Sequence, residues 1–483
     1  MLSHFGGFMR ILLVKPYPPL ALSKFLMDYF MHLEPLELEI VAGGIPVEEE
    51  VSIIDLSFER EPFEAFRAKL VTMKPDIIGY TGFSSQAALV RELAAFAKKH
   101  LPTAINVVGG IHATVIPADY AVQDIDIIVR GEGGTAFKEI VERFKKGQPL
   151  ASGDAILSPR DPDFSNKASL LPPKYPEIEK IPLPRRELVD RSKYFCVWTA
   201  SDEKKIKTIF PRTATIRTSN GCPFNCAFCV VHHIMRGQYL QRTPEDVVDE
   251  ISKLQEDHIY FVDDENFING DRMARIAQLL IDRGIKKKYI SWARSDTIVR
   301  RPDVFKLWKQ AGLSMVYVGL EAMTGERLEK LNKRTTVENN KKAVAILKEL
   351  GITLHASFML DPDFSEEDFA GLKKEVKKVC PAEVTFTVFS PSPGTEMWEK
   401  HKNDYIKDPY VYYDCMHTIF PTRLPLRKFY QRFSELYGIA FQSNPLRLNK
   451  VRFPLKELIT IINRGFKYVF ALRKLYKEYE PVK

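Results

Sequence analysis

The first 150 residues alternate between short apolar runs and segments with a helical spacing of apolar side chains. In one helical segment Phe137, Ile140, Val141 and Phe144 share a face, and Gly147 follows as a stop signal. The apolar runs are rich in Val and Ile, which is typical of parallel strands buried on both sides. This pattern predicts an α/β domain over residues 1–150 with a doubly wound, Rossmann-like sheet. The predicted strands are Ile11–Pro16, Val51–Leu56, Ile77–Phe83, Asn106–Gly110 and Asp126–Arg130.

A second alternation of strands and helices begins near Thr213. It follows a stretch over residues 151–210 that is rich in proline and charge, which we interpret as a linker. Six units predict a partial (β/α)6 barrel over residues 211–400, in which chemistry takes place at the C-terminal ends of the strands. Residues 401–483 have a helical pattern with many aromatic and basic side chains. The predicted barrel strands are Thr213–Thr218, His258–Asp263, Tyr289–Arg294, Met315–Leu320, Leu354–Leu360 and Val384–Phe389.

Composition and charge narrow the class of protein. Hydrophobic residues make up 45% and charged residues 27% of the 483 residues, as in a folded soluble protein. No uncharged apolar stretch of about 18 residues occurs, so we expect no membrane-spanning helix. The N-terminus lacks the apolar segment of a secretory signal, and Met9 is an alternative start. The net charge of +8 is too modest to imply a nucleic-acid partner, and we expect a cytoplasmic protein.

Three of the six cysteines lie within eight residues and form the pattern Cys-x3-Cys-x2-Cys. Cys222, Cys226 and Cys229 follow the first predicted barrel strand, which is where the barrel architecture places a cofactor. Such clustering indicates metal ligation in a reducing compartment. A [4Fe–4S] cluster normally takes four thiolates, so three on one loop leave one iron open to another ligand. A structural zinc site that also uses His232 or His233 is the alternative.

The cysteine pattern after the first strand of a (β/α) repeat resembles the radical S-adenosylmethionine (SAM) superfamily. Phe228, directly before the third cysteine, matches an aromatic residue that is common there in the family. The resemblance implies that SAM chelates the open iron through its amino and carboxylate groups. It also implies a SAM contact for Phe228, reductive cleavage to a 5′-deoxyadenosyl radical, and an external electron donor of the flavodoxin or ferredoxin type.

Charged residues at the ends of the next three strands fit the same family. The segment F-V-D-D-E-N-F after the second strand resembles a form common in the cobalamin-associated branch. This resemblance implies that Asp263, Asp264 and Glu265 lie near the methionine part of SAM. Arg294 ends the third strand and Glu321 the fourth, and the barrel geometry points both toward the same SAM pocket. For any single acidic residue here, a solvated loop is the alternative.

Two glycine-rich segments in the first domain resemble the cobalamin-binding domain of this branch. Glycines directly after a strand let the backbone approach a bulky ligand closely. Many such domains carry a D-x-H-x-x-G segment whose histidine ligates cobalt, but the matching segment at Asp55 has no histidine. The resemblance therefore implies cobalamin held without that lower ligand, and a degenerate domain that binds no cobalamin is the alternative. The residues implied to contact cobalamin are Gly109, Gly110, His112, Thr114, Gly131, Glu132 and Gly133, and for His112 a satisfied turn histidine is an equal interpretation.

The two resemblances together imply a cobalamin-dependent radical SAM methyltransferase. In this family one SAM yields the radical that removes hydrogen from an unactivated carbon, and methylcobalamin delivers the methyl group. Patches such as H-L-E-P-L-E-L near the N-terminus and C-V-V-H after the cysteine motif resemble the hopanoid C-3 methylase-like group. This implies a lipid-like hopanoid or isoprenoid substrate. A radical SAM cyclase or coupling enzyme without methyl transfer is the runner-up, and a non-catalytic cobalamin and Fe–S binding protein is a third interpretation.

The C-terminal segment bears on the substrate. Residues 451–483 contain eight basic and three acidic residues. A basic amphipathic helix can lie on an anionic membrane, which would place the protein at the inner face of the membrane. The alternative is a helix packed on the barrel with a solvated basic face. The apolar stripe of this helix consists of Leu455, Leu458, Ile459, Ile462, Phe466, Val469 and Phe470.

Overall fold

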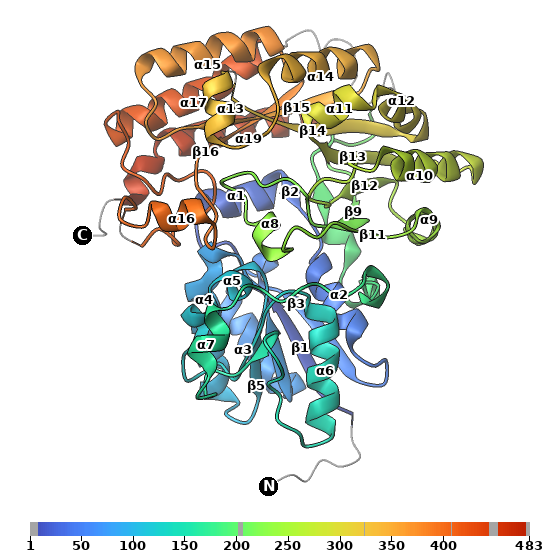
Figure 1. The fold of residues 1–483 in the computed structure, drawn as a ribbon, viewed down its shortest axis with the longest axis vertical. Coiled ribbons are helices and arrows are strands. Elements are labelled where there is room, and N and C mark those ends of the chain that lie inside the picture. The colour runs from blue at the N-terminus through green and yellow to red at the C-terminus, as the bar shows by residue number, and fades with distance from the viewer. Residues whose placement is uncertain (1–7, 201–205, 323, 407, 444–452, 480–483) are drawn as a thin grey trace.

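Two α/β units joined by an extended segment make up most of the chain (Figure 1). The computed structural model describes residues 8–200, 206–322, 324–406, 408–443 and 453–479. The N-terminal unit lies below the second unit in Figure 1, and the segment that connects them passes between the two.

The N-terminal unit contains the predicted doubly wound sheet, in the order β3-β1-β4-β5-β6-β7. The first five of these strands are parallel, and β7 pairs antiparallel with β6. Helices α3 and α4 cover one face, and α2 and α6 cover the other. The strands are β1 (Arg10–Lys15), β3 (Glu50–Asp55), β4 (Ile77–Tyr80), β5 (Ile105–Val108), β6 (Ile127–Val129) and β7 (Ile156–Leu157). The helices are α1 (Ala21–Tyr29), α2 (Leu36–Gly44), α3 (Pro62–Met73), α4 (Ala87–His100), α5 (Ile111–Val115), α6 (Gly133–Lys145) and α7 (Phe164–Ser169).

The apolar run in β1 shows why this sheet is covered on both faces. Ile11, Leu12, Leu13 and Val14 are all fully buried. Successive side chains of a strand point to opposite faces, so Leu12 and Val14 join the core under α3 and α4. Ile11 and Leu13 join the core under α2 and α6. A run without polar alternation is therefore what a central strand of this sheet needs.

The second unit is the predicted partial barrel. Its six strands are all parallel, in the order β16-β15-β14-β13-β12-β9. The predicted strands of both units are confirmed, with ends that differ by up to three residues. The strands are β9 (Thr213–Ile216), β12 (His258–Phe261), β13 (Lys288–Ala293), β14 (Leu313–Glu321), β15 (Thr353–Leu360) and β16 (Glu383–Val388). The helices around them are α8 (Val231–Ile234), α9 (Pro244–Lys253), α10 (Gly270–Asp282), α11 (Ser295–Arg300), α12 (Pro302–Ala311), α13 (Gly325–Lys330), α14 (Val337–Glu349), α15 (Glu366–Val379) and α16 (Glu396–Lys400).

The segment predicted as a linker has structure of its own. Its first part forms β7, so the N-terminal sheet continues past the predicted boundary at residue 150. Its last part forms β8 (Phe195–Cys196), which pairs with β2 (Met31–His32). Between them, the Arg186 guanidinium donates to Glu34 Oε1 (2.6 Å) in the first unit and to Glu250 Oε1 (2.7 Å) in the second. The segment therefore ties the two units together through buried charge.

The C-terminal region is helical, as predicted. Helix α17 (Leu426–Ser443) packs on α15, and α19 (Leu455–Arg473) packs on α17 and α1. Tyr430, Phe433, Tyr437, Tyr468 and Leu472 join the core cluster of the barrel. Within the described part of the chain, no helix is long and apolar enough to cross a membrane.

Candidate active site

The loop with the three cysteines starts at the C-terminal end of β9 and ends at α8. It begins with β10 (Ser219–Asn220), which pairs antiparallel with β11 (Leu240–Gln241), a strand that follows α8. Gly221 follows with a φ of +90°, and a Cβ there would lie 2.3 Å from Gln238 O. Only glycine fits this turn, since other residues are strained at such a φ and would collide with the backbone. The turn directs the chain back over the end of the barrel, where Cys222 is the next residue.

The cysteine loop is held in place by the chain that follows α13. The Ala227 N–H donates to Leu331 O (3.0 Å), and Asn332 Nδ2 donates to Asn225 O (2.6 Å). These bonds satisfy backbone groups that a loop of this kind would otherwise leave to water. The spacing of the three thiols is therefore supported from outside the motif itself.

The three thiols are the predicted donor set of an iron–sulfur cluster. Burial raises the pKa of the Cys222 thiol to about 12 and that of Cys229 to about 11, and the nearby Cys226 adds to both shifts. Three thiolates in one buried place need a metal to offset their charge. Among the described residues, no three Cys, His, Asp or Glu side chains are grouped closely enough to hold a single metal ion, and this applies to the three cysteines as well as to His232 and His233.

Arg294, at the end of β13, reaches the cysteine loop. Its Nη1 donates to Cys226 Sγ (3.8 Å), and its Cζ lies 3.6 Å from the ring centroid of Phe224. Its Nε donates to Asp296 Oδ1 (2.9 Å), which fixes the plane of the guanidinium. Arg294 thus brings a positive charge to a ligand thiol, and the stacking on Phe224 orients it.

Glu321, at the end of β14, is paired with a residue that sequence reasoning missed. Lys333 Nζ donates to Glu321 Oε1 (2.7 Å), and the two residues are only 9% and 8% exposed. Burial alone would lower the pKa of Lys333, but the charges of Glu321 and Cys226 raise it above its ordinary value. Lys333 therefore stays a cation next to the cysteine loop. It lies in the loop after α13, and no periodic pattern or motif in the sequence marks it.

Asp263 and Asp264 both hold the chain around the cysteine loop. Asp263 is buried and accepts from the Thr218 N–H (3.1 Å), the Thr218 hydroxyl (2.8 Å) and the Ser219 hydroxyl (2.6 Å). Asp264 is exposed and accepts from the Gly221 N–H (2.9 Å), beside the first cysteine. The carboxylate of Asp263 is fully used within the protein, whereas Asp264 keeps free acceptor positions at the loop.

Among Asp263, Asp264 and Glu265, only Glu265 has a buried carboxylate oxygen without a hydrogen-bond partner in the described part of the chain. Its Oε2 accepts from the Arg294 N–H (2.6 Å), while its Oε1 has no hydrogen-bond partner within the described residues. Burial raises the pKa of Glu265 to about 7. An unpaired buried oxygen costs free energy, so it points to a missing donor. The ammonium of a bound SAM is a donor of the required kind.

Phe228 is fixed through its backbone. Its carbonyl accepts from the Ser392 N–H (2.9 Å) in the loop after β16, and its ring is half-buried, with the centroid 6.0 Å from Lys333 Nζ. The last barrel strand thereby anchors the residue before the third cysteine. The structure thus brings Phe228, Arg294, Glu321 and Lys333 together at the cysteine loop.

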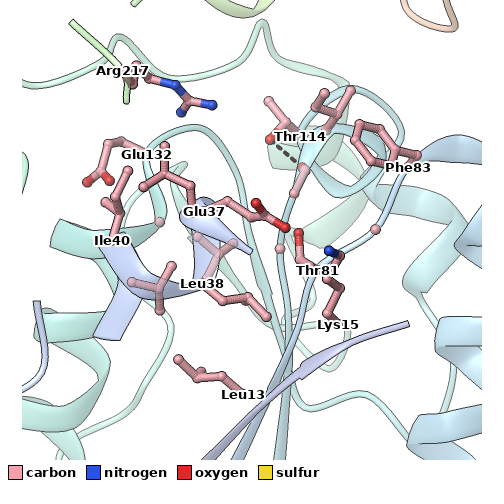
Figure 2. A pocket seen from close by; sticks show the side chains of 18 of the residues that line it. Leu13, Lys15, Glu37, Leu38, Ile40, Thr81, Phe83, Thr114, Glu132 and Arg217 are labelled. Carbon is pink, nitrogen blue, oxygen red and sulfur yellow. Dashed lines mark hydrogen bonds between the residues drawn. The ribbon is translucent and has the colours of Figure 1, made fainter. Parts of the chain in front are cut away.

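A cavity of about 910 Å³ lies between the two units, over the C-terminal ends of the N-terminal strands (Figure 2). Its floor includes Leu13 and Lys15, one side is formed by Glu37 and Leu38 of α2, and the connecting segment adds residues between positions 178 and 184. The barrel unit contributes Arg217, the first residue after β9. Six of the seven residues predicted to contact cobalamin line this cavity, namely Gly109, Gly110, Thr114, Gly131, Glu132 and Gly133.

The two glycine-rich loops are shaped by backbone that only glycine tolerates. Gly110 has a φ of +94°, and a Cβ there would lie 2.9 Å from Gly82 N. Gly131 has a φ of +81°. Thr114 joins the loops, because its hydroxyl donates to Gly110 O (2.8 Å; dashed in Figure 2) and accepts from the Gly131 N–H (3.0 Å). The backbone is therefore exposed to the cavity where side chains would fill it.

Glu132 caps α6 at the edge of the cavity. Its carboxylate accepts from the Gly134 N–H (2.8 Å) and the Thr135 N–H (2.7 Å). Gly134 is the second residue of α6, and a Cβ there would lie 2.6 Å from Pro182 Cγ. The missing side chain makes room for the connecting segment, which packs directly on α6.

The structure places His112 outside the cavity lining, unlike the other predicted cobalamin residues. It is fully buried, with Nδ1 3.0 Å from Ser84 Oγ and Nε2 2.9 Å from Asp119 Oδ2. Both ring nitrogens are engaged, so neither is available to a ligand. His112 supports the loop from behind, which agrees with the interpretation of it as a satisfied turn histidine.

The segment at Asp55, which lacks a ligating histidine, is instead part of a buried charge network. Lys15 Nζ lies 3.2 Å and His32 Nε2 3.5 Å from Asp55 Oδ2. Burial would raise the pKa of Asp55, but the bond to His32 and the charge of Lys15 hold it at about 2. His32 itself stacks on Phe58 at 3.8 Å between centroids. This network fixes the loop after β3 without a metal ligand.

Comparisons with known proteins match both units. Residues 216–376 match the radical SAM superfamily, and residues 29–141 match the B12 binding domain. The hopanoid C-3 methylase of Methylococcus capsulatus is 30% identical over 442 residues, which cover 90% of this chain and 81% of the relative. The chain belongs to the cobalamin-dependent radical SAM family.

One further relative and one solved structure are also similar to this radical SAM protein. An anaerobic magnesium-protoporphyrin IX monomethyl ester cyclase of Rubrivivax gelatinosus is 28% identical, over 74% of this chain and 64% of the relative. The solved structure of OxsB, a cobalamin-dependent SAM radical enzyme with aqua-cobalamin and SAM bound, has the same fold. It superposes with a TM-score of 0.68 at 17% identity, over 99% of this chain and 74% of OxsB.

Family membership settles the cofactors and the enzyme class. The protein is a radical SAM enzyme whose cofactors are a [4Fe–4S] cluster, SAM and cobalamin. Its substrate is a small molecule, and the radical chemistry requires a reductant. The interpretation as a non-catalytic binding protein is therefore not retained. The thiols of the cysteine loop fit the [4Fe–4S] cluster, and the unpaired oxygen of Glu265 fits the amino group of SAM. The glycine-lined cavity fits cobalamin.

Arg217 is a second residue of this radical SAM site that sequence reasoning missed. Figure 2 shows its guanidinium entering the cavity on the side of Glu132. Arg217 therefore faces the cavity between the two units from the end of the strand that leads into the cysteine loop. A signal was available, since a charged residue directly after a buried strand in this barrel lies at the catalytic end.

Proposed function

We propose that the protein transfers a methyl group to an unactivated carbon of a lipid-like substrate, of the hopanoid or isoprenoid type. The observation that carries this proposal is the single cavity whose wall is shared by the glycine-rich loops and by Arg217 and Asn220 of the barrel unit. When bound, the cluster and SAM supply a radical that removes hydrogen from carbon, and cobalamin supplies the methyl group. The three cysteines and the predicted SAM-contact residues do not line this cavity, but Arg217 and Asn220 lie directly before the cysteine loop, so the proposed methyl donor would lie next to the proposed radical source.

We assign each group of residues either a cofactor to bind or a charge to compensate. We assign the cluster to Cys222, Cys226 and Cys229, with Arg294 and Lys333 as buried cations that offset thiolate charge. We assign the amino group of SAM to Glu265, whose free oxygen lacks a donor. The glycine-rich loops are assigned to cobalamin, with the connecting segment excluding water from one side of it.

Two observations support a lipid-like substrate. The similar methylase of Methylococcus capsulatus carries a hopanoid in its name, and the match spans most of both chains. Many cavity-lining side chains are apolar, among them Leu13, Leu38, Ile40, Val41 and Phe83. We propose in addition that a flavodoxin or ferredoxin type protein supplies the electron, and that the enzyme works peripherally at the inner face of the membrane where such lipids reside.

Cyclisation without methyl transfer is the second candidate, because the cyclase of Rubrivivax gelatinosus also matches. The two reactions differ in what happens to SAM. Methyl transfer produces one S-adenosylhomocysteine for every 5′-deoxyadenosine, because a second SAM restores the methyl group. Cyclisation yields 5′-deoxyadenosine without S-adenosylhomocysteine.

The test begins with the full-length protein, reconstituted without oxygen with iron, sulfide and cobalamin, and supplied with SAM, a reductant and lipid extract from cells that lack the gene. We expect 5′-deoxyadenosine and S-adenosylhomocysteine in equal amounts and a lipid heavier by one CH2. The same lipid should be missing from cells without the gene. Formation of 5′-deoxyadenosine with a changed lipid but no S-adenosylhomocysteine would replace methyl transfer by cyclisation.

A further inference from the structure

Helix α19 has an apolar face that the protein leaves in solvent. Its five exposed apolar side chains recur every three or four residues, so they lie on one face of the helix. The opposite side is anchored in the protein, since Gly465, Tyr468 and Leu472 are buried. Hydrophobic burial therefore explains why α19 stays attached, but not why its outer face is apolar. The exposed side chains are Leu455 (71%), Ile459 (50%), Ile462 (37%), Phe466 (72%) and Phe470 (59%).

A row of lysines runs beside this apolar stripe. Lys456, Lys467 and Lys474 are exposed and follow one another at about three and about two helical turns, which keeps them on one flank. Lys474 Nζ lies 4.0 Å from the ring centroid of Phe470, so the lysine row and the stripe touch. Arg473 and Lys477 add exposed positive charge at the C-terminal end.

The acidic side chains of the same segment each interact with another part of the protein. Between residues 453 and 479 these are Glu457 and Glu478. Glu457 accepts from the Ile209 N–H (2.6 Å) and the Thr208 hydroxyl (3.1 Å), and Glu478 Oε2 lies 3.2 Å from His417 Nε2. The solvent side of α19 therefore carries apolar and positive groups together. Arg452 and Lys483, which the sequence pattern also includes, lie outside the described residues.

Helix α19 is also next to the cavity. Arg464 Nη1 donates to Tyr29 O (2.9 Å) at the end of α1, and its guanidinium lies over the Tyr29 ring at 4.9 Å. Ser23 and Met27, on the same helix α1, line the cavity. One helix thus separates the exposed stripe from the site where a substrate would react.

We propose that α19 docks the enzyme on an anionic lipid bilayer, with the apolar stripe among the acyl chains and the lysine row at the lipid phosphates. An apolar stripe flanked by lysines is the arrangement with which helices lie in a membrane interface. Each lysine near an anionic surface strengthens the attraction to the lipid phosphates. A lipid-like substrate, on which the purpose of this docking rests, would then pass from the bilayer along α1 to the cavity.

The test measures binding of the full-length holoenzyme to vesicles by flotation. Vesicles contain phosphatidylglycerol mixed with phosphatidylcholine, or phosphatidylcholine alone. We expect binding to the mixed vesicles that falls by roughly tenfold or more in Phe466→Ser/Phe470→Ser, because two exposed phenyl groups no longer enter the bilayer. Lys456→Glu/Lys467→Glu/Lys474→Glu should lose the preference for phosphatidylglycerol. Val47→Ser/Val71→Ser, which removes exposed apolar side chains far from α19 in the sequence, is the matched control and should bind normally.

Three results would overturn the docking proposal. The first is a wild-type enzyme that does not float with phosphatidylglycerol vesicles, and the second is a control variant that loses as much binding as the phenylalanine variant. The third is a dimer in solution, detected by light scattering, that the phenylalanine changes dissociate while vesicle binding is unaffected. Far-UV circular dichroism checks that each variant is folded. Vesicle binding is read without turnover, so it stands or fails separately from methyl transfer and from the identity of the methylated lipid.

Discussion

The two proposed cofactor sites of this enzyme are built in opposite ways. At the cysteine loop, side chains point inward, and the thiols, Arg294 and the Glu321–Lys333 pair lie close together. At the cavity proposed for cobalamin, side chains are absent, and glycines such as Gly110 and Gly131 leave the backbone as the wall. The first site is therefore damaged by removing atoms and the second by adding them. This difference teaches which substitutions separate the two sites experimentally.

The largest effect is expected from Cys226→Ala, which removes the buried thiol that Arg294 contacts. Iron content and 5′-deoxyadenosine formation should both fall below detection, because two thiolates on the loop no longer hold the cluster. Cobalamin content, measured by its visible absorbance, should stay at the wild-type level. Cys380→Ser changes an exposed cysteine outside the loop and is the control. Wild-type iron content in Cys226→Ala would contradict the assigned ligands.

Gly110→Ala should have the opposite effect, with loss of cobalamin and retention of iron, because it adds one methyl group to the proposed cobalamin site. Its φ of +94° and the 2.9 Å contact with Gly82 N make the new side chain costly, on the order of 1–3 kcal/mol before any clash is counted. We expect cobalamin retention to fall roughly tenfold or more while iron content is unchanged. Gly153→Ala has a similar φ of +61° with nothing within 4 Å of its Cβ, so it isolates the effect of backbone strain. Equal loss of cobalamin in both variants would contradict the proposed role of the Gly110 loop in cobalamin binding.

Lys333→Met tests how much the crowded side chains of the first site depend on one another. Without the lysine, the Glu321 carboxylate is left buried and unpaired, which costs about 3–5 kcal/mol. Denaturant unfolding of the cofactor-free protein should show this loss, and Lys333→Met combined with Glu321→Gln should recover most of it. An unchanged free energy of unfolding in Lys333→Met would mean that Glu321 reaches solvent.

The smallest effect concerns Glu265 and pH. Its pKa is about 7, so below that pH the carboxyl is protonated and no longer an anionic acceptor for an ammonium group. SAM affinity, measured by calorimetry without reductant, should weaken severalfold as pH falls from 8 to 6. Glu265→Gln should bind SAM weakly at both values. An unchanged pH profile in that variant would contradict the assignment.

The same carboxyl changes protein stability in the opposite direction. Its pKa is raised from an ordinary value of 4.5, so the folded state binds the proton more tightly than the unfolded state. The stabilisation from this proton is full below about pH 4.5 and is lost as pH rises through about 7. Bound SAM should oppose that loss, because it gives the charged carboxylate a partner.

Much of the fold and of the cysteine loop could be predicted, because their signals are local. A fully apolar run such as Ile11–Val14 has few alternatives to a central strand, and the cysteine spacing is itself the ligand set. The positions of Lys333 and His112 could not be predicted in this way. Lys333 lies near Cys226 only because the loop after α13 packs on the cysteine motif. The His112 ring points away from the cavity because it is hydrogen-bonded to Ser84 and Asp119. Both outcomes depend on contacts between segments that are distant in the sequence.

The segment between residues 178 and 184 has a consequence for work with fragments of this enzyme. It forms part of the cavity wall and packs on Gly43 and Gly134, where a Cβ would collide with it. A fragment that ends with the last strand of the N-terminal sheet, at Leu157, would therefore lack one side of its binding site. A fragment meant to test cobalamin binding by the N-terminal unit should therefore extend at least to Pro184. Chimeric enzymes that exchange one unit for that of a homologue will need to keep this segment with the unit it covers.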